Sequence, residues 1–221
     1  QSQDAESNIV KPEKVEFLAE DGIKVVGNVY EIDKTSPVIV LCHQARFNKF
    51  EYEGITQKLN ELGFNCIAID QRSGGPIANQ VNETNLNAVA KNKPTDFLDA
   101  EQDIIAAVDY AWKRYGQKVI LWGSSYSSTL ILYVAIENAN ASTAIAFSPG
   151  NYFATEKGSL IEKMSSFDKP LFITSSKEEI PSVKDLLSEM QLNNKQIHFE
   201  PKGEGHHGSR ALWENQSGGE E

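Results

Sequence analysis

Short apolar runs alternate with longer amphipathic segments along most of this chain. The runs have the length of buried strands, whereas the segments between them repeat apolar residues at helical spacings. Alternating strands and helices form a mainly parallel sheet covered on both faces, because each crossover helix returns the chain to the same sheet edge. We therefore predict an α/β fold, a three-layer α/β/α sandwich around a mainly parallel sheet of about eight strands. The predicted strands are 15–18, 23–30, 37–43, 64–70, 118–122, 143–147, 170–174 and 196–200, and the predicted helices are 49–62, 95–115, the stretch after Ser125, and 181–192.

The first two strands flank the turn Glu20-Asp21-Gly22 and predict an antiparallel hairpin. Residues 1–12 come before this hairpin and are expected to form a flexible N-terminal segment. A single core serves up to roughly 250 residues, so we expect one domain over 1–221. The chain starts at Gln1 rather than Met, as after removal of a secretory signal, which predicts a secreted or periplasmic protein. Artificial trimming would leave the same pattern.

The formal net charge of −10 argues against a nucleic-acid partner, because phosphate binding requires clustered Lys and Arg. No apolar run is long enough to span a bilayer, so membrane insertion is not expected. Cys42 and Cys66 each lie in a predicted strand, which favours buried free thiols over a disulfide. These features leave the oligomeric state open.

The segment 71–93 is polar, rich in Gly and Asn, and without clear periodicity. It is long for a loop inside a compact domain, so it is either a substrate-facing element or an irregular surface. From their places in loops, we expect Phe47, Arg72, Tyr126 and Tyr152 to line a substrate pocket.

The most specific motif is G-x-S-x-S around Ser125, where an apolar strand meets a helix. A nucleophile elbow needs small residues two positions before and after its serine, because the strand-to-helix turn is tight. Gly123 and Ser127 meet this requirement for Ser125, so Ser124 and Ser128 are expected to be spectators. The helix start would also favour a developing anion. The alternative is a serine-rich cap of an ordinary helix.

A nucleophilic serine needs a base, generally a histidine that a carboxylate orients. His198 lies within the last strand and His43 closes the third, so both are expected to be structural. His206 and His207 follow the last strand in a glycine-rich loop. We favour His207, since Gly208 lets the loop turn freely, and keep His206 as the alternative. A zinc site is not expected, because no third ligand stands at a suitable spacing.

The acid should follow the strand 170–174, where Glu178 and Glu179 stand. We prefer Glu178 on its spacing from the strand end, with Glu179 as the alternative. Asp168 precedes the strand and would emerge at the wrong end of the sheet. For an oxyanion, the first backbone N–H donor would be Tyr126, and the second would be Gln44 in the loop after the third strand. Gln44 could instead simply cap that loop.

Taken together, these segments resemble the α/β-hydrolase superfamily, and in size and layout its small dienelactone hydrolase-like serine esterases. The resemblance covers nearly the whole chain and rests on VIVLCHQ, on CIAIDQRSGG, which is similar to the D-x-R-G-x-G turn, on GSSYS, and on the terminal Gly-His-His-Gly. It implies a triad of Ser125, His207 and Glu178, an acyl-enzyme intermediate on Ser125, and no cofactor.

Three features depart from the family pattern. Ser127 stands where glycine is usual, Gln44 replaces a glycine-rich oxyanion loop, and the acid is Glu rather than the commoner Asp. Because no large lid insertion follows the strand 143–147, we expect a small soluble carboxylic ester as substrate. A peptidase or thioesterase on the same triad, and a non-catalytic binding module with this fold, are the alternatives.

Overall fold

Eight strands form one sheet in the order β1-β2-β4-β3-β5-β6-β7-β8. The computed structural model describes residues 8–221, so the first seven residues of the predicted flexible segment 1–12 lie outside the described part. Strands β1, β2 and β4 pair antiparallel, and the other neighbours pair parallel. The predicted hairpin and the predicted α/β fold are confirmed. The strands are β1 Glu13–Leu18, β2 Lys24–Tyr30, β3 Val38–Cys42, β4 Asn65–Ile69, β5 Val119–Ser124, β6 Ala141–Phe147, β7 Leu171–Thr174 and β8 Gln196–Phe199.

The central strands are buried on both faces, as their continuous apolar sequences predict. Every residue of β3 and β4 is buried. Alternate residues of a strand point to opposite faces, so Val40 and Cys42 join one core cluster while Ile39 and Leu41 join the other. Both Cys42 and Cys66 are buried free thiols, as predicted.

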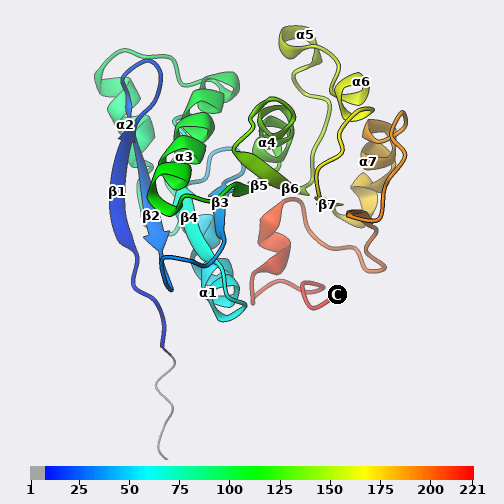
Figure 1. The fold of residues 1–221 in the computed structure, drawn as a ribbon, viewed down its shortest axis with the longest axis horizontal. Coiled ribbons are helices and arrows are strands. Elements are labelled where there is room, and N and C mark those ends of the chain that lie inside the picture. The colour runs from blue at the N-terminus through cyan, green and yellow to red at the C-terminus, as the bar shows by residue number, and fades with distance from the viewer. Residues whose placement is uncertain (1–7) are drawn as a thin grey trace, which may run out of the picture.

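The helices are distributed unevenly over the two faces of the sheet. The larger core cluster contains residues of α3 (Ala100–Tyr115), α4 (Tyr126–Glu137), α6 (Leu160–Met164) and α7 (Ile180–Leu186). The smaller cluster contains residues of α1 (Glu53–Glu61), against which Leu212 and Trp213 of the C-terminal segment pack. Figure 1 shows α2 and α3 beside β1 and β2, α1 beside β4, and α7 beside β7. Within residues 8–221, no helix combines the length and apolarity needed to cross a membrane.

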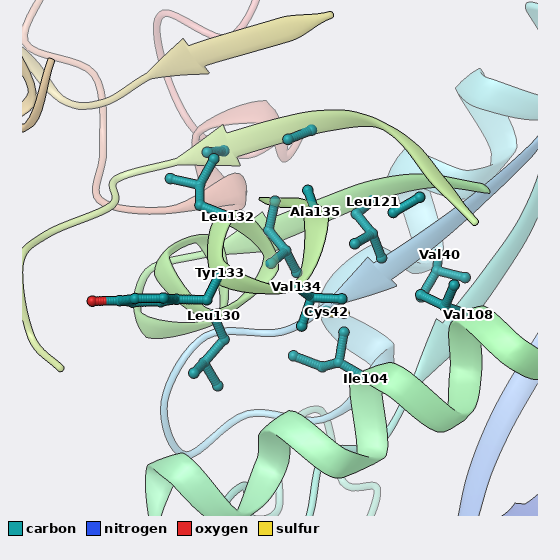
Figure 2. Packing of buried hydrophobic residues seen from close by; sticks show 14 of the residues in the cluster. Val40, Cys42, Ile104, Val108, Leu121, Leu130, Leu132, Tyr133, Val134 and Ala135 are labelled. Atoms are coloured by element: carbon teal, nitrogen blue, oxygen red, sulfur yellow. The ribbon is translucent and has the colours of Figure 1, made fainter. Parts of the chain in front are cut away.

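Helix α3 packs on the sheet through a face on which alanines stand among Ile104 and Val108. Ile104 and Val108 lie beside Cys42 and Val40 of β3 (Figure 2). The alanines of α3 at 107 and 111 complete the buried face, whereas the larger Ile105 and Trp112 are exposed. Alanine lets a helix approach a sheet closely, so this face packs without its largest apolar residues.

The segment 71–93, predicted to be a loop, contains a helix, α2 (Glu83–Ala90). The Asn82 side chain caps it by accepting the Asn85 N–H at 2.8 Å. Helix α2 covers β2, where the Thr84 hydroxyl accepts the Val26 N–H at 2.9 Å. A polar, asparagine-rich composition hid its helical periodicity. Two other short helices were not predicted, α5 (Ala154–Lys157) and α6, and α7 ends at Leu186 rather than near 192.

Arg72, predicted to line the substrate pocket, is instead fully buried. Its guanidinium donates to Asp103 Oδ1 at 2.8 Å and to Asp21 Oδ2 at 2.6 Å. Two carboxylates therefore compensate the buried cation, and the side chain ties the β1–β2 turn to α3.

Removing this cation should leave the buried Asp103 carboxylate uncompensated. We expect Arg72→Met to lower the free energy of unfolding by about 3–5 kcal/mol, and Arg72→Met with Asp103→Leu to lower it less. Urea unfolding of the wild type and both variants measures the differences. If Arg72→Met has the same free energy of unfolding as the wild type, the ion cluster does not stabilise the fold.

Candidate active site

The turn from β5 into α4 holds Ser125 in a conformation that serine rarely adopts. Its φ is 58° and its ψ is −126°, outside the favoured regions for a side chain with a Cβ, at a cost of order 1–3 kcal/mol. A Cβ at Gly123 would lie 2.6 Å from the backbone of Ser127, so only glycine fits this close approach. The strand, turn and helix predicted around Ser125 are all present.

Ser125 contacts one of the two adjacent histidines. The Nε2 atom of His207 lies 2.7 Å from Ser125 Oγ. His207 comes from the loop after β8, between Gly205 and Gly208, which both have positive φ angles. Of the two candidates considered for the base, His207 is the one that the structure brings to the serine.

The other ring nitrogen of His207 contacts Glu179 and not Glu178. Glu179 Oε2 lies 2.6 Å from His207 Nδ1, which corrects the preference for Glu178. The reason is the short turn η3 (Lys177–Glu179), in which Ser176 and Glu179 form a capping box that directs Glu179 back over the strand end. Glu178 is exposed on the same turn. The spacing Ser176-x-x-Glu179 was the sequence signal that could have identified it.

Glu179 is held in its ionised form by three donors. Burial alone would raise the pKa of this carboxyl, but hydrogen bonds from His207, Ser176 and Ser148 outweigh burial and lower the pKa to about 2. Because a carboxylate only accepts, His207 Nδ1 carries the proton toward Glu179. The Nε2 lone pair then faces the Ser125 hydroxyl, which donates to it. Ser125, His207 and Glu179 thus form one continuous line of hydrogen bonds.

The two predicted oxyanion donors differ in their surroundings. Tyr126 starts α4, where a first-turn N–H has no acceptor within the helix. The N–H of Gln44, in contrast, donates to Glu51 Oε1 at 2.7 Å. The assignment of Gln44 needs correction, because its N–H already donates to the carboxyl of Glu51, which the next turn of the chain brings close.

Next to His207 is a cleft of about 420 Å³. Glu178, the acid preferred from the sequence, and His206, the alternative base, line it. The residues predicted to line a pocket have different neighbours. Phe47 stacks on Trp213 with ring centroids 6.1 Å apart, and the Tyr126 ring is buried. Tyr152 is half exposed, and burial together with the charge of Glu179 raises the pKa of its hydroxyl.

Similar solved structures exist, although no protein-family model and no curated protein matches the chain. The Pyrococcus furiosus esterase Pf2001 has a TM-score of 0.72 at 16% identity, over 92% of this chain and 85% of that one. A dienelactone hydrolase from Anabaena variabilis has a TM-score of 0.70 at 14% identity, over 94% and 91%. A cold-adapted esterase from an Arctic intertidal metagenomic library has a TM-score of 0.65 at 15% identity, over 90% and 88%.

The chain has the α/β-hydrolase fold. Enzymes with this fold that use a serine nucleophile carry it at a strand-to-helix elbow, and their triad follows the chain order serine, acid, histidine. Ser125, Glu179 and His207 occur in that order and lie at the carboxyl ends of β5, β7 and β8. The α/β-hydrolase fold therefore accounts for how residues 82 positions apart come within hydrogen-bond distance.

Another buried carboxyl is that of Glu51 in the turn η1 (Lys49–Tyr52). Its Oε1 accepts the Gln44 N–H, while its Oε2 has no partner among the described residues. Burial raises the pKa of Glu51 to about 7, although the hydrogen bond from Gln44 opposes that rise. The folded chain thus holds a proton on Glu51 at a pH where the unfolded chain has lost it.

This raised pKa predicts a loss of stability as the pH rises. The contribution of Glu51 is fully present below its ordinary pKa of 4.5 and is lost as the pH rises through about 7. Glu51→Gln keeps an acceptor for the Gln44 N–H but cannot ionise. From about pH 5 to about pH 8, its free energy of unfolding should fall less than that of the wild type, by about 2–3 kcal/mol. Urea unfolding at both pH values tests this, and parallel pH dependence in both proteins would contradict it.

Proposed function

We propose that this protein is a serine hydrolase that cleaves carboxylic esters of small molecules through an acyl-enzyme on Ser125. The observation that carries the proposal is the unbroken line from Ser125 Oγ to His207 at 2.7 Å and from His207 to Glu179 at 2.6 Å. The strained backbone of Ser125 adds support, because strain of this kind gathers at functional sites.

In the proposed reaction, Ser125 Oγ bonds to the ester carbonyl carbon while His207 Nε2 takes the hydroxyl proton. The Glu179 carboxylate stabilises the imidazolium, and the Tyr126 N–H donates to the oxyanion. The imidazolium then protonates the leaving alcohol as the ester C–O bond breaks. Water, deprotonated by His207, attacks the acyl-enzyme, and Ser125 leaves with the returned proton.

Ala45 supplies the second oxyanion donor in this proposal, in place of Gln44. The imidazole of His43 accepts the Gln71 N–H at Nε2, so its Nδ1–H donates to the Gln44 carbonyl at 2.8 Å. In a trans peptide the N–H points opposite to the C=O, so the Ala45 N–H is directed away from His43. The buried His43 and Glu51 together fix the orientation of this loop.

A small ester is the favoured substrate class. The similar solved structures include esterases and a dienelactone hydrolase. Between β6 and β7 the chain inserts only the short helices α5 and α6, which form no large lid. Because fold and triad do not determine the leaving group, amide and thioester substrates belong in the same assay.

The first test compares hydrolysis of p-nitrophenyl acetate and butyrate by the wild type and by Ser125→Ala. We expect kcat/KM to fall by at least about 10³-fold, because the residual activity of a triad without its nucleophile is small. Turnover of anilide or thioester analogues in place of esters would move the substrate class to the peptidase or thioesterase alternative.

Glu179→Ala and Glu178→Ala form a matched pair, since each removes one carboxylate from the same turn. Loss of the orienting acid should lower kcat by about 10³–10⁴-fold in Glu179→Ala, and Glu178→Ala should change kcat by less than about tenfold. Circular dichroism of both variants is the control for correct folding. No turnover of ester, anilide or thioester substrates by folded wild type would reject the hydrolase and favour a non-catalytic binding module.

A further inference from the structure

The loop that carries His207 cannot fix its own position. Gly205 and Gly208, on either side of the two histidines, have φ angles of 62° and 76°, a region that glycine enters without steric cost. A loop with such freedom places an imidazole reproducibly only when other groups hold its backbone.

Two buried serines hold this backbone. The Gly208 N–H donates to Ser148 Oγ at 2.9 Å, and the Ser209 N–H donates to Ser124 Oγ at 2.8 Å. Ser124 ends β5 and Ser148 directly follows the adjacent strand β6, and both are almost completely buried. Ser124, predicted to be a spectator, thus anchors the residue two positions after His207.

The Ser148 hydroxyl donates its proton to the Glu179 carboxylate. Because Ser148 Oγ accepts the Gly208 N–H, its own hydroxyl is free to donate, and it lies 2.9 Å from Glu179 Oε1. Glu179 Oε2 faces His207 Nδ1, and the chain leads from His207 directly to Gly208. Ser148, Glu179, His207 and Gly208 therefore close a ring in which one hydroxyl joins the acid to the loop of the base.

The backbone conformation of Ser148 is a second observation that points to a role for its hydroxyl. Its φ is 61°, a left-handed conformation in which glycine is the less strained choice. Its N–H donates to the Thr174 carbonyl at 2.8 Å, which continues the pairing of β6 with β7. A serine at such a position brings strain without any gain to the backbone, so its contribution comes from the side chain.

We propose that Ser148 is a positioning residue that sets the distance between Glu179 and His207 by binding the acid and the base loop with one hydroxyl. This inference rests on the proposed function, because it assigns a role within the same reaction. Ser124 acts beside it as a second anchor of the loop.

The test is Ser148→Gly, which removes the hydroxyl and relaxes the backbone. Misplacing the imidazole should lower kcat for p-nitrophenyl butyrate by about 10–100-fold, with KM changed by less than about threefold. Asn92→Gly is the matched control, since Asn92 also has a positive φ, 52°, but lies outside the ring; it should keep the wild-type kcat. Ser148→Ala provides a second variant that removes the hydroxyl without adding glycine.

Proton NMR gives a readout that does not depend on turnover. The proton between His207 Nδ1 and Glu179 should give a downfield resonance in the wild type and in Asn92→Gly, and this resonance should shift or broaden in Ser148→Gly. Wild-type kcat together with an unchanged resonance in both Ser148 variants would overturn the inference and leave the proposed function standing. A wild type without ester turnover would reject the proposed function, while the resonance would still decide whether Ser148 couples Glu179 to His207.

Discussion

The close approach of β5 and α4 at Gly123 is the constraint on which the site depends. With no Cβ at this position, the backbone of Ser127 comes near the strand, and the chain reverses direction at Ser125 with a positive φ. The turn holds the serine hydroxyl at the carboxyl end of a parallel sheet, where α/β folds bind their ligands. A side chain at 123 would push the helix away and move the hydroxyl with it.

The order of the strands brings further polar groups to the turn at Ser125. Strands β5, β6, β7 and β8 are successive neighbours in the sheet, and all four run parallel. Each strand or the loop that follows it contributes one group at the same edge, in the order Ser125, Ser148, Glu179 and His207. The groups come together because neighbouring strands lie only about 4.8 Å apart. Distant parts of the sequence thus meet without any long connecting loop.

Much of this organisation could be predicted from the sequence, because strand and helix periodicities and the G-x-S-x-S pattern are local signals. The choice between Glu178 and Glu179 depended on the direction in which a single turn of 3-10 helix faces. In the sequence, only the capping-box spacing from Ser176 to Glu179 indicated that direction. The role of Gln44 depended on the buried carboxyl of Glu51, whose side chain folds back onto the loop. Ser148 carries no motif, since the role proposed for it depends on partners 31 and 60 residues away.

The central claim is that Ser125 is a nucleophile activated by His207. Labelling the folded protein with a fluorophosphonate, followed by mass mapping of its peptides, tests this most directly. We expect one covalent adduct on Ser125 in the wild type, and strongly slowed labelling in His207→Ala, because no base then takes the hydroxyl proton. Absence of an adduct on folded wild-type protein, or an adduct on Ser124 in its place, would contradict it.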